Sequence, residues 1–106
     1  MAIKPLKLFN LAPVTIVSAG TAYPICVAPQ YVASVSLQAN YNNGGRVSVG
    51  GNDVTNDNGI LLDKGESAVI ERPANTRDDI EIEAGSIYVT STSSGDIVRV
   101  SILRRA

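Results

Sequence analysis

The sequence contains no histidine and no tryptophan, and it has only one cysteine and one phenylalanine. Without histidine the chain lacks the commonest general base and the commonest metal ligand. Its serines therefore have no partner for a Ser-His-Asp arrangement, and its one thiol has no partner for a Cys-His pair. Cys26 cannot form an intrachain disulfide, and its position between Ile25 and Val27 is typical of a small buried apolar residue. These absences predict a protein that is not an enzyme and needs no cofactor.

Long apolar runs are missing too. The longest, Tyr23 to Pro29, is much shorter than the roughly 20 residues of a membrane-spanning helix. Asn10 and Pro13 interrupt the apolar stretch that a signal peptide would need. We therefore expect synthesis in the cytoplasm and no membrane as a partner.

Charge is distributed unevenly, although the net charge is only −1. Residues 53–83 contain nine acidic and three basic residues, a net charge of −6, whereas the remainder has six basic residues and one acid, a net charge of +5. Such clusters form either solvated strand faces and loops or complementary patches that meet between subunits. Arg104 and Arg105 are too few for a surface that follows phosphates, so we expect no nucleic acid as a partner.

The chain is rich in Val, Ile, Thr and Ser, and turn-forming residues interrupt these at short intervals. No stretch of ten residues keeps a helical period. The pattern predicts about eight short strands among nine candidate segments, which are residues 14–18, 25–28, 31–38, 46–49, 60–62, 67–71, 79–83, 86–91 and 97–103. This spacing favours one all-β domain, a single antiparallel β-sandwich or a small barrel.

Two strands show the period of two that marks a half-buried strand. In residues 31–38 the alternation puts Val35 and Leu37 on one face and Val32 on the other. In residues 97–103 it puts the side chains of Val98, Val100 and Ile102 inward. Asn43-Gly44 favours a tight turn with positive φ, which would join residues 31–38 and 46–49 as a hairpin.

Residues 1–13 are predicted to form an extended N-terminal arm, and residues 14–106 the domain. Pro5 and Pro13 bracket an apolar piece, which indicates an edge strand or an extended segment. Its apolar side chains need a surface to pack on, either in their own domain or on a neighbouring subunit. The residues that we expect at an interface are Leu6, Leu8, Phe9, Leu11, Arg104 and Arg105.

Two segments contain clusters of polar or acidic residues of the kind that metal sites and glycosidases use. Residues 52–59 are rich in oxygen ligands, but the register of an EF-hand fails, since Gly59 and Ile60 fall where a ligand and glycine belong. We therefore predict a structural turn there. Asp79, Glu81 and Glu83 share one strand face, yet a glycosidase needs a sugar cleft with aromatic platforms, so a solvated face is predicted. No metal site is expected.

From residue 46 a series of short motifs follows in order, namely Arg46–Gly51, Asp53–Thr55, Asn58–Leu62, Lys64–Ser67, Ile87–Val89 and Val98–Val100. Their order resembles that of small β-rich virion structural proteins of tailed bacteriophages. The resemblance implies a structural role, such as a capsid decoration (cement), fibre-associated or tail protein, located in the virion. It carries no catalytic site, and residues 1–45 take no part in it.

Two functions follow as expectations. The first is a capsid decoration subunit that forms a homo-oligomer, with a trimer favoured, and docks on the major capsid protein or another virion protein. The second is a receptor- or carbohydrate-binding module of a tail or fibre, with Tyr41 and the loop 40–45 as its binding region.

Overall fold

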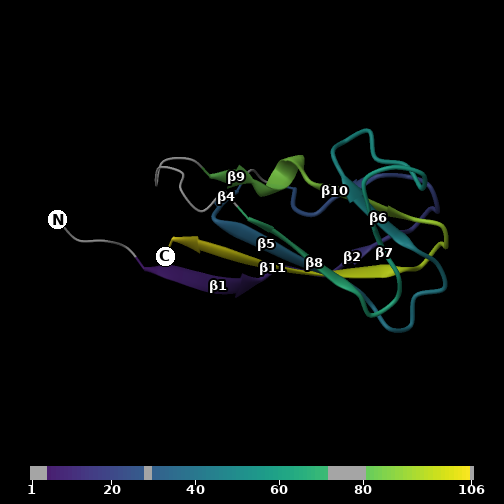
Figure 1. Cartoon of the computed structure of the whole chain (residues 1–106), viewed down its shortest axis with the longest axis horizontal. Helices are drawn as coiled ribbons and strands as arrows, with labels where there is room; N and C mark the ends of the chain where they lie inside the picture. Colours follow the sequence, from purple (N-terminus) through teal and green to yellow (C-terminus); the bar gives the residue numbers. More distant parts are fainter. Residues whose placement is uncertain (1–4, 28–29, 72–80, 106) are drawn as a thin grey trace.

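The computed structural model describes residues 5–27, 30–71 and 81–105. Within them the chain is all-β, with eleven strands in antiparallel sheets and a single three-residue 3-10 helix, η1 (Ala84–Ser86). Two larger sheets lie in layers, one through β5 and β11 and the other through β6 and β10 (Figure 1).

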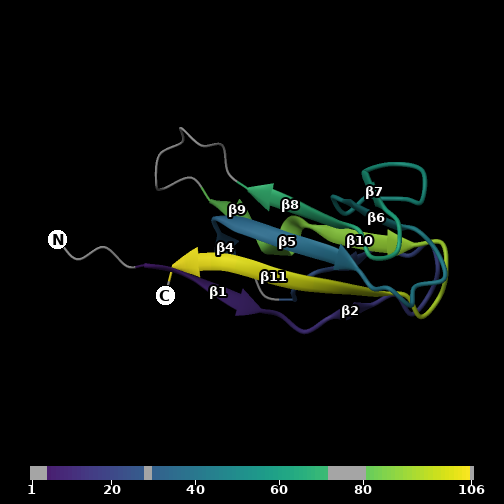
Figure 2. The same ribbon diagram turned by 60° about the horizontal axis from the view of Figure 1, so that its bottom comes forward.

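The first sheet has the order β1-β11-β5-β8, and β2 also pairs with β11. Figure 2 shows its strands side by side. Their bounds are β1 (Leu6–Asn10), β2 (Val14–Thr15), β5 (Ser34–Ala39), β8 (Ser67–Glu71) and β11 (Ile97–Arg105). The register places Val100 beside Leu37 and Ile102 beside Val35, so the alternating apolar residues of the two central strands face the core together.

The second sheet has the order β3-β10-β6-β7, and β4 pairs with β9 in a separate small sheet. The bounds are β3 (Tyr23–Pro24), β4 (Tyr31–Val32), β6 (Val47–Gly50), β7 (Ile60–Leu62), β9 (Ile82–Glu83) and β10 (Tyr88–Ser91). Val49 and Val89 lie opposite each other and are buried. One core of Val, Ile, Leu and Ala fills the space between the sheets, as expected for a chain without tryptophan.

The predicted all-β class is confirmed, but a closed barrel is not formed. Each large sheet ends in strands with a single strand neighbour, β1 and β8 in the first sheet and β3 and β7 in the second. Residues 1–13, predicted as an extended arm, contain β1, which pairs with β11 of its own domain from Leu6 opposite Arg105 to Asn10 opposite Ser101. Residues 1–4 lie outside the described residues.

The predicted hairpin between residues 31–38 and 46–49 is wrong. β5 belongs to the first sheet and β6 to the second, so residues 40–46 connect the layers. Neither Asn43 nor Gly44 has the positive φ of a tight hairpin turn. The pair forms other bonds instead, because the Asn43 side chain binds the backbone of Ile97 and the Gly44 N–H binds Asp96.

Three strand predictions also need correction. Residues 31–38 form two strands with Ala33 between them, and this break lets Val32 as well as Val35 be buried. Residues 25–27 form no strand, because pairing with β10 occurs earlier, in β3. Of the strand predicted over 79–83, only Ile82–Glu83 is observed, and residues 79–80 lie outside the described residues. Among the residues described, no helix is long and apolar enough to span a membrane.

Candidate functional site

The two large sheets differ in how their outer faces are covered. Ser48 and Thr90 alternate with core valines of the second sheet, yet they are 1% and 0% exposed. The loops around Gly20 and Asn56 approach each other, and Figure 1 shows loops beside β6 and β10. On the first sheet, by contrast, every second residue of β8 and the outward Arg99 of β11 are exposed. The outer face of the first sheet is therefore the candidate interaction surface.

Exposed apolar side chains on this face lie on its edge strands. Leu6 and Leu8 of β1 are 43% and 67% exposed, and Val69 of β8 is 59% exposed. The outward residues of central strand β5 are polar, namely Ser34, Ser36 and Gln38. An edge strand with exposed apolar side chains is a ready template for pairing with another chain.

The backbone of β1 pairs with β11 on one side, and no other strand in the described part of the chain pairs with its other side. The register puts Leu11 opposite Val100, and the Leu11 N–H donates to the Val100 carbonyl at 3.1 Å. Backbone groups alternate in direction along an antiparallel strand. Those of Lys7 and Phe9 therefore face β11, whereas those of Leu6, Leu8 and Asn10 face away from the sheet.

The same reasoning applies to β8 at the opposite edge. The Ala39 N–H donates to the Glu66 carbonyl at 2.9 Å, and this register continues into β5 and β8. Alternation then directs the backbone groups of Ala68 and Ile70 toward β5. Those of Ser67, Val69 and Glu71 face away, and no other described strand pairs with them.

The six predicted interface residues gather at one end of the first sheet but face two ways. Leu6 and Leu8 point outward, whereas Phe9 and Leu11 pack against the core. The Arg104 guanidinium lies 4.1 Å from the centroid of the Phe9 ring, a cation–π contact.

Arg105 is also engaged within the chain. Its Nε lies 3.5 Å from Glu81 Oε1. The four inward or paired residues of the predicted interface thus stabilise their own domain. Sequence analysis missed Val69, because an alternating Ala-Val-Ile strand does not reveal which of its residues the partner sheet covers.

A groove of about 610 Å³ also lies on this face, and its central residues are polar. The polar lining residues are Asn10, Ser36, Gln38, Ser67, Arg99 and Ser101. Leu11 and Pro13 line it as well, and the lining includes no acidic residue. The short serines leave room around Arg99, so the groove offers hydroxyl and amide groups with one positive charge.

Tyr41 lies close to this groove. Its side chain is on a residue 76% exposed, and its ring lies against Gly65. The Gly65 carbonyl accepts a hydrogen bond of 3.3 Å from Gln38 Nε2, a groove residue. The loop 40–45 therefore places an exposed aromatic ring near a polar groove.

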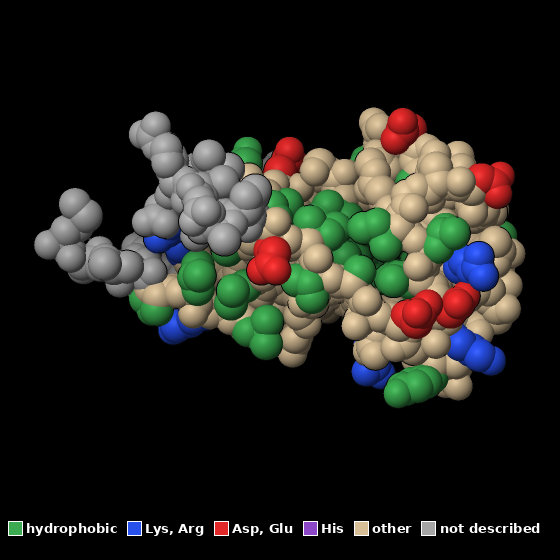
Figure 3. Space-filling view, viewed as in Figure 1, with side chains coloured by type: hydrophobic (Ala, Val, Ile, Leu, Met, Phe, Trp, Pro, Cys, Tyr) green, Lys and Arg blue, Asp and Glu red, His purple; other side chains and the backbone are tan. Residues whose placement is uncertain are grey.

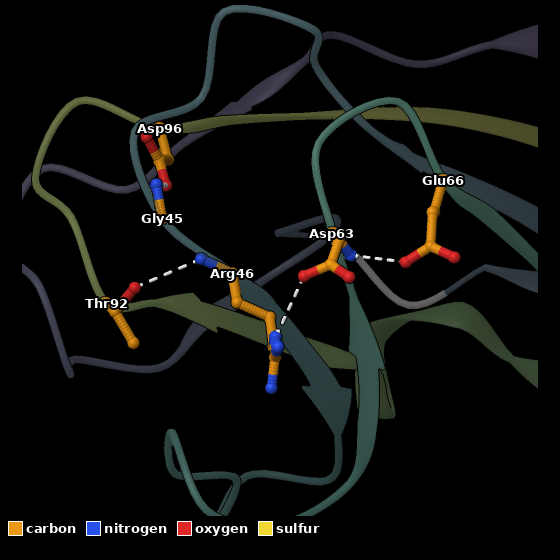
Figure 4. Close-up of polar contacts among 6 residues, drawn as sticks. All are labelled: Gly45, Arg46, Asp63, Glu66, Thr92 and Asp96. Carbon is orange, nitrogen blue, oxygen red and sulfur yellow. Dashed lines mark hydrogen bonds and ion pairs between the residues drawn. The ribbon is translucent and has the colours of Figure 1, made fainter.

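Next to Tyr41, the loops at this end of the molecule are held together by polar contacts (Figure 4). The Arg46 N–H donates to Thr92 Oγ1 at 3.0 Å, and the Arg46 side chain binds Asp63 at 2.9 Å. The Asp63 N–H donates to Glu66 Oε1 at 2.7 Å. Since Arg46 and Asp63 have mostly exposed side chains, their ion pair contributes at most about 1 kcal/mol. These contacts stabilise loops and form no chemical site.

The oxygen-rich loop 52–59 is a structural turn, as predicted. The Thr55 N–H donates to Asn58 Oδ1 at 2.8 Å, and the Asp57 N–H donates to Thr55 Oγ1 at 3.2 Å. No group of three Asp, Glu or Cys side chains placed to hold a metal ion is found within 5–27, 30–71 and 81–105.

The remaining acidic and thiol side chains that could support chemistry do not come together in one site. Glu81 faces Arg105, whereas Asp78 and Asp79 lie outside the described residues. Cys26 packs against the core, and burial, followed by the negative charge of Glu83, raises the pKa of its thiol. A thiol with a raised pKa is a weak nucleophile at neutral pH.

No protein-family model, curated protein or solved structure matches this chain.

Proposed function

We propose that this chain is a non-enzymatic structural subunit that assembles with copies of itself, and that it serves as a capsid decoration (cement) protein of a tailed bacteriophage. It is made in the host cytoplasm and carried in the virion, where it docks on the major capsid protein or another virion protein. The order of motifs between residues 46 and 102 supports the phage assignment by resemblance.

One observation carries the assembly role. Among the described residues, no strand pairs with the outer edge of β1 or of β8 in the first sheet, and the exposed large apolar side chains of its outer face, Leu6, Leu8 and Val69, lie on those two edge strands. Monomeric proteins protect such edges because they promote association. In this chain both edge strands expose apolar side chains, and a polar central face lies between them.

We interpret the two layers as a β-sandwich, with β1 as the ordered part of an N-terminal arm. Phe9 and Leu11 fix this arm to the domain, while Leu6 and Leu8 remain available to a neighbour. A stable subunit contact of this kind needs more than about 1,000 Å² of buried surface. We favour a trimer, because closed symmetry satisfies every edge in the assembly.

The test combines sedimentation velocity of the full chain with co-sedimentation on empty heads of the phage that encodes it. We expect an oligomer that pellets with the heads. Leu8→Glu weakens association, whereas the matched variant Val17→Glu, at a residue 72% exposed and outside the two edge strands β1 and β8, does not. A chain that is monomeric and stays in the supernatant would contradict the proposal.

The groove supports a second candidate, a receptor- or carbohydrate-binding module of a tail or fibre. Hydroxyl and amide side chains around Arg99, with Tyr41 nearby, suit a sugar that carries an acidic group. A glycan array would show binding that Arg99→Ala removes and Arg46→Ala retains, since Arg46 lies outside the groove lining. Equal binding by both variants would eliminate this candidate.

A further inference from the structure

We infer that subunits join head to tail, with β1 of one copy pairing with β8 of the next so that the first sheet continues from subunit to subunit. This inference rests on the self-assembly proposed above and names its geometry. The partner is a second copy of this chain, and the mode is strand addition at a sheet edge.

Strand direction permits this contact. β1 is antiparallel to β11, β11 to β5, and β5 to β8. β1 and β8 therefore run in opposite directions, so a copy placed beside β8 and sharing its sheet orientation presents β1 in the antiparallel sense. The extended sheet stays antiparallel throughout.

The alternation of backbone and side chains matches as well. The β1 residues whose backbone faces the open edge, Leu6, Leu8 and Asn10, have their side chains on the outer face. The same is true of Ser67, Val69 and Glu71 on β8. In a hydrogen-bonded antiparallel pair both side chains point to one face. When the two edges pair, the outer faces of both copies therefore lie on the same side of the continued sheet.

Pairing Leu8 with Val69 brings together the most exposed apolar side chains of the two edges. Aliphatic neighbours directly opposite each other stabilise a sheet by about 0.2–1 kcal/mol per pair. Figure 3 also shows hydrophobic side chains gathered in the middle of the view, where Figure 1 places the strip between β8 and β10. A neighbour added at β8 lies next to this strip.

The charges at the two edges suit a contact between β1 and β8. The start of β1 and the end of β11 carry Lys7, Arg104 and Arg105, whereas β8 ends at Glu71. The antiparallel arrangement brings this basic end of one copy to the acidic end of β8 in the next.

Disulfide trapping tests the contact. Leu8→Cys and Val69→Cys are made as separate chains, each with Cys26→Ser and with tags of different mass, and the two are coexpressed. A hydrogen-bonded antiparallel pair has a Cα separation of about 5.5 Å, within the range that a disulfide spans. We expect a covalent heterodimer after mild oxidation. Leu61→Cys, on edge strand β7 of the second sheet, replaces Val69→Cys as the control and gives none.

Each outcome decides between the two proposals. A disulfide-linked dimer formed by the Leu8→Cys chain alone, or by the Val69→Cys chain alone, overturns the head-to-tail contact but leaves self-assembly standing. An oligomer that gives no trapped pair has the same consequence. A chain that sediments as a monomer at every concentration overturns both.

A second variant tests the backbone contact. Leu8→Pro removes an N–H that faces the open edge, where proline is tolerated. We expect at least tenfold weaker association with an unchanged circular dichroism spectrum. An oligomer of unchanged affinity would count against the contact even if trapping succeeded.

Discussion

The side-chain amide of Asn43 takes the place of a strand residue opposite Ile97. Its Oδ1 accepts the Ile97 N–H at 2.8 Å, and its Nδ2 donates to the Ile97 carbonyl at 3.0 Å. The next two N–H groups, of Gly44 and Gly45, donate to the buried Asp96 carboxylate at 2.8 and 3.1 Å. Ser91 Oγ donates to the same carboxylate. Residues 43–45 are thereby fixed to the start of β11, and this guides the chain from the first sheet into the second.

Asn43→Ala should lower the free energy of unfolding by about 1–3 kcal/mol. The substitution leaves the Ile97 N–H without its acceptor in a partly buried position, whereas the Ile97 carbonyl keeps a hydrogen bond of 3.1 Å from the Asn40 N–H. An unmade hydrogen bond there costs about this much. Urea denaturation measures the change. Asn42→Ala, at an exposed neighbour, is the control and should change the free energy by less than about 0.5 kcal/mol. Equal losses of unfolding free energy in both variants would show that the hydrogen bonds of the Asn43 side chain do not stabilise the loop.

The strands that the sequence predicts best are those with strict alternation and a single buried face. In β11 the side chains of Val98, Val100 and Ile102 are buried as predicted. The turn at residues 52–59 was also predictable, because Asn and Asp compete locally for backbone groups. Both features depend on neighbouring residues alone.

The features that sequence could not predict depend on distant partners. Asn43-Gly44 has the composition of a hairpin turn, but hydrogen bonds to Asp96 and Ile97, more than fifty residues away, select another conformation. The split at Ala33 likewise follows from its N–H bond to Leu103. For the candidate interface, sequence located the apolar segment of β1. It did not indicate that Leu8 points outward and Phe9 inward, because these directions follow from the pairing of β1 with β11.

Gly59→Ala should be far more damaging than Gly95→Ala. Both glycines have positive φ, +79° and +88°, so both variants incur backbone strain of about 1–3 kcal/mol. An added Cβ at Gly59 would also lie 2.3 Å from the Val49 carbonyl oxygen, whereas nothing lies within 4 Å at Gly95. We expect Gly95→Ala to fold with reduced stability and Gly59→Ala to lose more free energy of unfolding in the same thermal melts. Equal stabilities would indicate that the loop 52–59 moves freely away from β6.

Alkylation should detect the environment of Cys26. Burial and Glu83 raise the pKa of this thiol above its ordinary value of 9.0, which lowers the fraction of reactive thiolate. We expect native protein to react with iodoacetamide at pH 8 severalfold more slowly than the urea-unfolded chain. A native rate that matches or exceeds the unfolded one would contradict the raised pKa.

The same shift has a consequence for stability. Because the thiol has a higher pKa in the folded state than in the unfolded chain, it contributes stability at pH values below the unfolded-state pKa. This contribution is lost as the pH rises through the folded-state pKa. Stability should therefore decline above about pH 9 more in the wild type than in Cys26→Ser, which lacks this titration. Denaturation at pH 8 and pH 10 measures the difference.

The two faces of β1 should separate stability from assembly. Phe9 packs against the core and lies beneath Arg104, so Phe9→Ala should lower the free energy of unfolding by about 2 kcal/mol, less than for a fully buried ring. Phe9→Leu keeps most of the packing and loses the cation–π contact, at about 0.5–1 kcal/mol. Leu8→Ala, at a residue 67% exposed, should stay within about 0.5 kcal/mol of wild type when the protein is too dilute to associate.

For association we expect the reverse, with a larger effect from substitution of Leu8 than of Phe9. Leu8→Glu places a carboxylate on an edge that would face Val69 and Glu71 of a neighbour, so we expect a dissociation constant raised at least tenfold, equivalent to about 1.4 kcal/mol. Phe9→Leu leaves the outer face unchanged and should associate as wild type does. Sedimentation velocity across a concentration series compares the two. If Phe9→Leu weakened association as much as Leu8→Glu, the oligomer would depend on the position of β1 as a whole, and the outward leucines would not be its contact.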